Sequence, residues 1–322
     1  MAQLNTTAQR PIGSPFDARS TAAQVLAGID LSGKNVLMTG GYSGIGLAAT
    51  TALAAAGAHV IVPARRPEQA VEALAGVGEV DELDLADLDS VAGFADRFLG
   101  SGRDLHMVIN SAGVMATPHS IVGPGWESQF AINHLGHFAL VNRLWPAIER
   151  GQGRVVAVSS AGHRTSGIRW DDIDFATGYD RWAAYGQSKT ANALFALHLD
   201  ALGRAAGVRA FSLHPGGILT PLQRHLSHQD QVDAGWIDQA GNVLVDWMKT
   251  PEAGAATQVW AATSPDLAGL GGVYLEDCEV AEPHDEAGGV PNGVHPWAAD
   301  PEAAARLWAL SAERTEVNAF AR

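Results

Sequence analysis

The stretch NVLMTGGYSGIG at positions 35–46 decides the fold of this chain. An apolar run ends at Thr39, and glycines at 40, 41, 44 and 46 follow before an apolar stretch with helical spacing that reaches Ala56. Glycine adopts positive φ readily and, without a Cβ, lets its backbone approach a ligand closely. A helix that begins there offers free N–H groups and a partial positive charge. The stretch therefore predicts a strand, a tight turn and a helix whose first turn binds a phosphate.

Beyond this turn, short apolar runs alternate with longer helical stretches. Strands are expected at 35–39, 58–62, 79–83, 105–110, 155–159, 208–213 and 272–275, and helices at 45–56, 67–75, 90–99, 126–149, 185–206, 251–263 and 302–312. Continuous apolar runs such as VVAV at 155–158 are typical of strands buried on both faces. The alternation predicts an α/β fold, a single doubly wound Rossmann domain whose parallel sheet is covered by helices on both faces.

The alternation of strands and helices is confined to the middle of the chain, which divides the chain into three parts. We expect an N-terminal arm at 1–30, the Rossmann domain at 31–275 and a C-terminal extension at 276–322. Within the domain, 219–250 is a long insertion that contains Trp236 and Trp247. Insertions after the carboxyl end of a strand are where open α/β sheets set substrate specificity. This insertion is therefore expected to form a small substrate-binding lobe.

Composition excludes several classes of protein. The 322 residues are 47% hydrophobic and 17% charged, which excludes a disordered chain. The single cysteine, Cys278, cannot form an internal disulfide or a thiolate metal cluster. A net charge of −14 argues against nucleic acid or an anionic membrane as the partner. No apolar run approaches the roughly 20 residues that span a bilayer, and residues 1–20 lack the core of a signal peptide. A cytoplasmic protein is expected.

The spacing of the glycines narrows the class of turn. The pattern Thr-Gly-x-x-x-Gly-x-Gly, which starts at Thr39, differs from Gly-x-Gly-x-x-Gly and resembles the glycine signature of the short-chain dehydrogenases/reductases. The resemblance runs from about Leu31 to Tyr274. It implies that the turn binds the pyrophosphate of a nicotinamide dinucleotide. The residues that it assigns to this turn are Gly40, Tyr42, Ser43, Gly44, Ile45 and Gly46.

The tip of the second strand indicates which dinucleotide is bound. This position, about 20 residues beyond the glycines, faces the adenosine ribose in a Rossmann domain. An NAD site places a carboxylate there, whereas this chain has Arg65 and Arg66 and no acid between Val60 and Pro67. A guanidinium grips a phosphate bidentately. The pair therefore favours NADP(H) over NAD(H), with Arg65 as the better candidate by resemblance to the family.

Three further motifs resemble cofactor-binding motifs of the family. LDL at 83–85 resembles the Asp-Leu/Val pair at the adenine, and NSAG at 110–113 resembles Asn-Asn-Ala-Gly, although Ser111 departs from the second Asn. HPGGILT at 214–220 resembles the Pro-Gly-x-x-x-Thr beside the nicotinamide, whose carboxamide Ile218 and Thr220 would orient. The cofactor residues that these motifs imply are Asp84, Leu85, Asn110, Ala112, Gly113, Pro215, Gly216, Ile218 and Thr220.

Tyr185 and Lys189 lie four residues apart at the start of a helical stretch, so they share one helix face. A phenol with an ordinary pKa of about 10 can donate a proton to a forming alkoxide. A cation about 5 Å away, at an effective dielectric of ~20, favours the phenolate by roughly 3 kcal/mol, or about two pKa units. We therefore expect Lys189 to lower the pKa of Tyr185. By resemblance, both residues also contact the cofactor, Lys189 through the nicotinamide ribose.

Two other segments complete the resemblance. Ser160 ends the fifth strand with its neighbour Ser159 and matches the family's catalytic serine, which positions the substrate oxygen. The gap of about 25 residues from Ser160 to Tyr185 resembles the retinol-dehydrogenase-like and protochlorophyllide-reductase-like branches. Asn133 would interrupt its helix and hold a relay water beside Lys189. His134 and His137 are three residues apart, but no third ligand accompanies them, so no metal is expected.

The resemblance implies an NADP(H)-dependent oxidoreductase of the alcohol dehydrogenase or carbonyl reductase type. Hydride moves between nicotinamide C4 and a carbonyl or alcohol carbon, and Tyr185 gives or takes the proton. Trp236 and Trp247 suggest that the small-molecule substrate is apolar and bulky. By family resemblance, a homodimer or homotetramer would use the helices at 126–149 and 185–206, unless the C-terminal extension covers them.

Two alternatives from other classes stay open. A non-catalytic NADPH-binding sensor or scaffold would use the same nucleotide site, although it would not need the Ser, Asn, Tyr and Lys set. An epimerase or dehydratase of the related extended family would retain its nucleotide tightly. Its usual glycine spacing, Thr-Gly-x-x-Gly-x-x-Gly, is absent from this chain.

Overall fold

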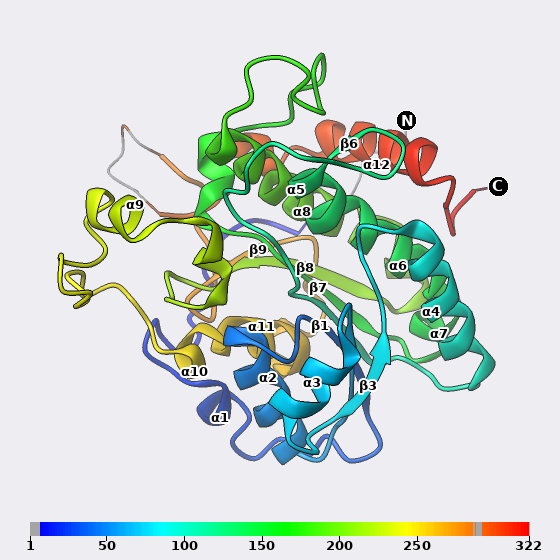
Figure 1. Cartoon of the computed structure of the whole chain (residues 1–322). Helices are drawn as coiled ribbons and strands as arrows, with labels where there is room; N and C mark the ends of the chain where they lie inside the picture. The colour runs from blue at the N-terminus through cyan, green and yellow to red at the C-terminus, as the bar shows by residue number, and fades with distance from the viewer. Residues whose placement is uncertain (1–6, 286, 288–291, 322) are drawn as a thin grey trace.

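The computed structural model describes residues 7–285, 287 and 292–321. Its centre is one sheet of eight strands within the described residues, in the order β10-β9-β8-β7-β4-β1-β2-β3 (Figure 1). Seven of these strands, β1–β4 and β7–β9, pair in parallel, and β10 pairs antiparallel with β9. The strands are β1 (Asn35–Thr39), β2 (His59–Ala64), β3 (Glu79–Glu82), β4 (Met107–Asn110), β7 (Arg154–Val158), β8 (Arg209–His214), β9 (Tyr274–Glu276) and β10 (Glu279–Val280).

Helices cover both faces of the sheet (Figure 1). One face carries α1 (Ala22–Val25), α2 (Gly44–Ala55), α3 (Pro67–Leu74), α10 (Pro251–Gly254) and α11 (Ala256–Thr263). The other carries α4 (Leu88–Gly100), α6 (Gly136–Arg143), α7 (Trp145–Arg150), α8 (Arg181–Gly203) and α12 (Pro301–Thr315). Each layer buries its own apolar cluster against the strands. The doubly wound parallel sheet expected from the alternation is therefore confirmed.

The single helix expected at 126–149 is wrong. This segment begins with β6 (Trp126–Glu127), which forms a hairpin with the preceding β5 (Ile121–Val122). It continues through α5 (Ser128–Phe130) and a π-helical turn at Ala131–Leu135, and only then enters α6. Glu127 is the reason that the helix starts late, because its buried carboxylate accepts hydrogen bonds from the amides of Gln129 and Phe130.

The C-terminal extension packs into the domain through α12. Trp308 stacks on Phe195 of α8 with ring centroids 5.8 Å apart, and meets Phe138 of α6 edge to face. Nε2 of His134 lies 2.7 Å from the hydroxyl of Ser311. The helix therefore covers the outer face of α6 and α8, on which self-association was expected.

The N-terminal arm follows the β9–β10 edge of the sheet. The side chain of Gln9 donates to the carbonyls of Tyr274 and Ala281 and accepts from the amide of Tyr274. The carboxylate of Glu279 accepts from three consecutive amides, at 12–14. Side-chain hydrogen bonds thus fix the arm onto the last strands. Within the residues described, no helix is both long and apolar enough to cross a membrane.

Candidate active site

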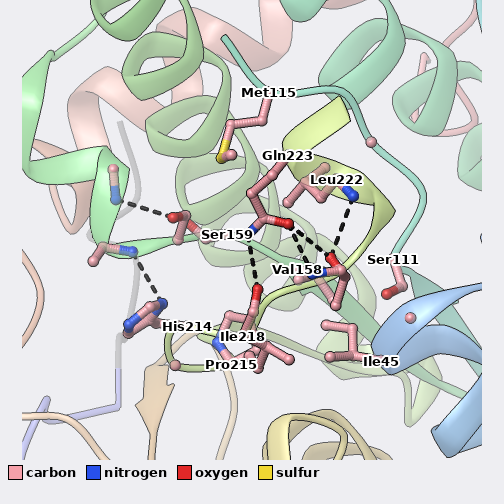
Figure 2. Close-up of a pocket in the computed structure, with 18 of the residues that line it drawn as sticks. Ile45, Ser111, Met115, Val158, Ser159, His214, Pro215, Ile218, Leu222 and Gln223 are labelled. Carbon is pink, nitrogen blue, oxygen red and sulfur yellow. Dashed lines mark hydrogen bonds between the residues drawn. The ribbon is translucent and has the colours of Figure 1, made fainter. Parts of the chain in front are cut away.

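A cavity of about 1010 Å³ lies at the carboxyl ends of the parallel strands. Figure 2 shows how side chains from separate segments, among them Ser111, Ser159, His214 and Gln223, surround one space. The cavity brings most of the expected residues together. Those that line it are Gly40, Tyr42, Ser43, Gly44, Ile45, Gly46, Arg65, Arg66, Ala112, Gly113, Ser160, Tyr185, Lys189, Pro215, Gly216, Ile218, Thr220, Trp236 and Trp247.

Four expected residues do not line the cavity: Asp84, Leu85, Asn110 and Asn133. The carboxylate of Asp84 accepts from the amide of Ala86 within its own turn, and Leu85 is buried. Asn110 is buried at the end of β4, and neither its side-chain oxygen nor its side-chain nitrogen has a hydrogen-bond partner within the described chain. A buried amide without partners is costly, so the end of β4 carries an unsatisfied polar side chain behind the cavity.

The glycine turn forms a cradle that side chains would fill. Gly40 and Gly44 have φ of +68° and +53°, which favour glycine. A Cβ on Gly46 would overlap the carbonyl oxygen of Gly40, so the start of α2 meets the turn without any space for a side chain. Ser43, the N-cap of α2, makes no capping hydrogen bond through its side chain. The first amides of α2 are therefore available to an anion, and the turn fits a dinucleotide pyrophosphate.

Arginines border the cavity beside this turn. Arg65 and Arg66 follow β2 with exposed side chains. Arg224, from the 3₁₀-helix at Pro221–His225, lines the same cavity, and both burial and the charge of Arg65 lower the pKa of its guanidinium. Arg224 carries no signal in the sequence, because it stands in an irregular insertion. Its nearness to Arg65 comes only from the folding of that insertion over the turn.

Tyr185 and Lys189 lie side by side on the first turns of α8, with Nζ of Lys189 5.6 Å from the centre of the phenol ring. Nζ donates to the carbonyl of Val158 over 3.0 Å. Burial raises the pKa of Tyr185 to about 12, and its hydrogen bond with Ser160 lowers the pKa in part. Burial also lowers the pKa of Lys189 to about 8. The net lowering of the Tyr185 pKa that we expected is thus corrected, because loss of water around the phenol is the largest effect on it.

Asn133 lies behind these groups, in the π-helical turn. Its side-chain oxygen accepts from the amide of Val114, and its side-chain nitrogen donates to the carbonyl of Val114 and to the hydroxyl of Ser188. The side chain thus joins the loop after β4 to α8, one residue before Lys189. No group of three or more residues with metal-ligand spacing occurs in the described ranges.

The loop after β8 is held by a residue that the motif analysis missed. Gln223 donates to the carbonyl of Ile218 over 2.8 Å and accepts from the amide of Thr220 over 2.8 Å. The hydroxyl of Thr220 in turn accepts from the amide of Leu222, and Thr220 and Gln223 together form a capping box at the start of the 3₁₀-helix. The Thr-x-x-Gln spacing at 220–223 was the available signal. The capping box fixes Ile218 and Thr220 beside the glycine turn.

The insertion supplies the apolar side of the cavity. Met115, Tyr185 and Leu226 form a small buried cluster, against which Trp182 and Trp236 pack. Trp247 is 53% exposed, and its ring fills the space that a side chain at Gly217 would need. Arg19 of the N-terminal arm donates to the carbonyls of residues 246 and 248, and so holds the insertion at the cavity. This side is suited to an apolar group beside Tyr185.

Comparisons with known proteins agree with this arrangement. A family model described as short chain dehydrogenase matches residues 34–231. A Streptomyces lividans protein named "Probable oxidoreductase" is 43% identical over 296 residues, which cover 88% of this chain and 98% of that protein. A crystal structure of an uncharacterised protein from Mycobacterium paratuberculosis has a TM-score of 0.70 and 33% identity, covering 93% of this chain and 98% of that one. The Pseudomonas aeruginosa RhlG/NADP complex has a TM-score of 0.59 and 25% identity, covering 77% and 95%.

Proposed function

Because the chain belongs to the short-chain dehydrogenase/reductase family, we propose that it is an NADP(H)-dependent carbonyl reductase or alcohol dehydrogenase in which Tyr185 moves the proton. The bound nucleotide would supply or accept the hydride at nicotinamide C4. The observation that carries the proposal is the pairing of Tyr185 with Lys189 inside the cavity that the glycine turn opens. The rest of the chemistry falls to the residues around that pair.

The cofactor would be held in three places. The amides at the start of α2 would bind the pyrophosphate, and the loop from Pro215 to Thr220 would hold the nicotinamide. Arg65 and Arg66 would bind the 2′-phosphate, which supports NADP(H). The NADP complex of a structural relative is in keeping with that choice.

Proton transfer would proceed from the neutral phenol. With a pKa raised to about 12, Tyr185 is protonated at neutral pH and is suited to donate to a forming alkoxide. Ser160 would hold the substrate oxygen by its hydroxyl. Lys189, with a pKa of about 8, is mostly charged at pH 7. One of its N–H bonds is used by Val158, which leaves others for the nicotinamide ribose and for a relay water held near Asn133.

The substrate would be an apolar carbonyl compound or alcohol. Trp182, Leu222 and Trp236 stand beside Tyr185 and offer an aromatic and aliphatic wall. The insertion at 219–250 would thus act as the substrate lobe. Since α12 covers α6 and α8, any homodimer or homotetramer would use another surface, and sedimentation would give its mass. The lone cysteine remains our reason to propose a reducing compartment such as the cytoplasm.

The test is a panel of aromatic and aliphatic aldehydes, ketones and alcohols, assayed with NADPH, NADP, NADH and NAD. We expect NADPH oxidation with at least one apolar carbonyl compound. Tyr185→Phe should lower turnover by at least about a thousandfold and keep NADPH affinity within about twofold. NADPH binding with no turnover across the panel would favour the sensor, and a nucleotide retained through purification would favour the epimerase. Wild-type turnover in Tyr185→Phe would overturn the proposed role of the phenol.

A further inference from the structure

The backbone carbonyl of Ser160 accepts two hydrogen bonds from side chains that the reaction itself does not use. Nδ1 of His163 lies 2.6 Å from this oxygen, and the hydroxyl of Tyr274 lies 3.2 Å from it. Both side chains are buried, His163 in the 3₁₀-helix after β7 and Tyr274 at the start of β9. Two donors from separate elements therefore converge on the peptide that follows the proposed catalytic serine.

The contact that Nε2 of His163 makes decides that the ring hydrogen is on Nδ1. Nε2 of His163 accepts from the backbone amide of His295 over 3.0 Å, so Nε2 carries no hydrogen and Nδ1 must carry it. Burial lowers the pKa of His163 to about 4, which keeps the ring neutral in this tautomer. The pKa of Tyr274 is raised by burial, so its hydroxyl keeps its hydrogen. Both groups are thus permanent donors to Ser160 at neutral pH.

The C-terminal extension supports this arrangement from behind. Besides the amide of His295, the indole nitrogen of Trp297 donates to the carbonyl of His163 over 2.9 Å. On the cavity side, Nδ1 of His214 accepts from the amide of Ala161 over 3.0 Å (Figure 2 labels His214). The 3₁₀-helix (Ala161–Thr165) is therefore fixed at its 160–161 peptide by β8 and β9, and at its 163–164 peptide by Trp297.

This fixation determines where the serine hydroxyl points. The Oγ of Ser160 accepts from the amide of Gly162 over 3.0 Å, which uses one of its lone pairs. Its own hydrogen is then directed elsewhere, and the Tyr185 hydroxyl is a neighbour in the cavity whose pKa Ser160 lowers. Rotation of the 160–161 peptide would displace the Gly162 amide and so remove the hydrogen bond that holds Oγ. Holding the Ser160 carbonyl therefore holds the catalytic hydroxyl in register with Tyr185.

We propose that Tyr274 and His163 are positioning residues that hold Ser160 in its catalytic orientation, and that the C-terminal extension completes the site through His295 and Trp297. The inference rests on the proposed carbonyl chemistry at Ser160. Small misplacements of a reacting group have large effects on rate. The C-terminal extension then contributes to catalysis by holding the residues that position Ser160.

The experiment uses the full-length chain with NADPH and 9,10-phenanthrenequinone, a flat apolar dicarbonyl. Tyr274→Phe removes one donor, and we expect kcat to fall about tenfold while the Kd for NADPH and the Tm stay near wild type. Trp297→Phe should lower kcat about threefold, because it acts one contact further away. Tyr179→Phe, which removes a phenol hydroxyl outside the cavity, is the matched control and should leave kcat unchanged.

A double-mutant cycle tells positioning from general stabilisation. If Tyr274 acts only through Ser160, adding Tyr274→Phe to Ser160→Ala should lower kcat no further. A full tenfold loss in the Ser160→Ala background, or wild-type kcat in Tyr274→Phe, would overturn the inference. If Tyr274→Phe lowers the Tm, His163→Asn and His163→Leu are compared instead. His163→Asn keeps a hydrogen-bond donor near the Nδ1 position, so it should retain more activity than His163→Leu.

A second readout does not depend on turnover. With ¹⁵N-labelled histidine, we expect His163 to show a protonated Nδ1 and an unprotonated Nε2 at pH 7, with and without NADPH. The opposite tautomer would overturn the inference even in an active enzyme. A wild-type chain that shows this tautomer but reduces neither the quinone nor any carbonyl compound of the panel would instead overturn the proposed function.

Discussion

The hydroxyl of Thr39 lies 2.9 Å from Nε2 of His137, and this contact joins the nucleotide side of the sheet to the π-helical turn. Nδ1 of His137 lies 3.0 Å from the carbonyl of Asn133 and donates to it, so Nε2 is the acceptor of the Thr39 hydroxyl hydrogen. The same hydroxyl oxygen accepts from the amides of Ser111 and Ala112. A single threonine thus ties together β1, the loop after β4 and the turn of Asn133.

Thr39→Val removes the hydroxyl that makes these hydrogen bonds and keeps the shape of the side chain. Two amides and one imidazole nitrogen would lose their partner, and a buried group without a partner costs about 1–3 kcal/mol. We expect the free energy of unfolding to fall by about 2 kcal/mol and NADPH affinity to fall about tenfold. Urea unfolding and fluorescence titration measure the two effects. Thr39→Ser keeps the hydroxyl, and an equal loss in that variant would contradict the explanation.

Arg65→Glu tests the choice of dinucleotide. A carboxylate at the tip of β2 would repel the 2′-phosphate and accept from a free ribose hydroxyl. We expect the ratio of kcat/KM for NADPH to that for NADH to fall by at least about a hundredfold, and the preference to invert. Arg97→Glu, whose side chain pairs with Asp81 away from the cavity, is the control for charge alone. An unchanged ratio in Arg65→Glu would refute the assignment.

Asp200 is the buried carboxylate on which the end of α8 depends. Asp200 is 1% exposed, and its carboxylate accepts two hydrogen bonds from Arg209 and one from the amide of Ala210. Removal of this carboxylate would leave the guanidinium of Arg209 without that partner. Asp200→Ala should lower the free energy of unfolding by about 3–5 kcal/mol. Asp104→Ala, which breaks an exposed pair with Arg150, should cost at most about 1 kcal/mol. Equal losses in chemical denaturation would refute the distinction.

Acid should unfold this protein steeply because loss of water, by full burial of three side chains and partial burial of His214, keeps four histidines neutral. Burial lowers the pKa of His134 and His214 to about 3 and that of His137 and His163 to about 4, from 6.5. Below pH 6.5 the unfolded chain takes up protons that the folded chain refuses, so stability falls as pH drops towards 4. Each histidine costs about 2 kcal/mol at pH 5.

Urea unfolding at pH 5, 6 and 7 measures this slope. His134→Gln should make the slope shallower by about one proton. Equal stability at pH 5 and pH 7 would show that the four rings take up protons in the folded state.

The sheet was predictable because its central strands, such as β4 and β7, are buried on both faces and are therefore mostly apolar, whereas the edge strand β3 is polar. The 126–149 segment was not predictable, because distant contacts decide where its helix begins. A Cβ at Gly136 would overlap the carbonyl of Leu85, so α6 starts where it can approach the turn after β3. Helical periodicity reports apolar spacing along one segment, and it carries no information about that distant carbonyl. Only the folded chain shows why the π-helical turn lies there.

The cavity residues were predictable where a motif of adjacent residues carries them, as at Tyr185 and Lys189. Their pKa values were not, because the cost of burying the phenol depends on every segment packed around it. Arg224 and Tyr274 were missed for a related reason. Each comes from a segment without a motif, and each reaches the site only through the tertiary fold.

Gln9 and Tyr274 are separated by 265 positions and yet share hydrogen bonds. On a ribosome, the arm is therefore made well before β9, the strand on which it docks. Closing so long a loop costs entropy that is recovered only once β9 and β10 are in place. We therefore expect the arm to attach late, so a segment synthesised long before β9 becomes ordered only after β9 is in place.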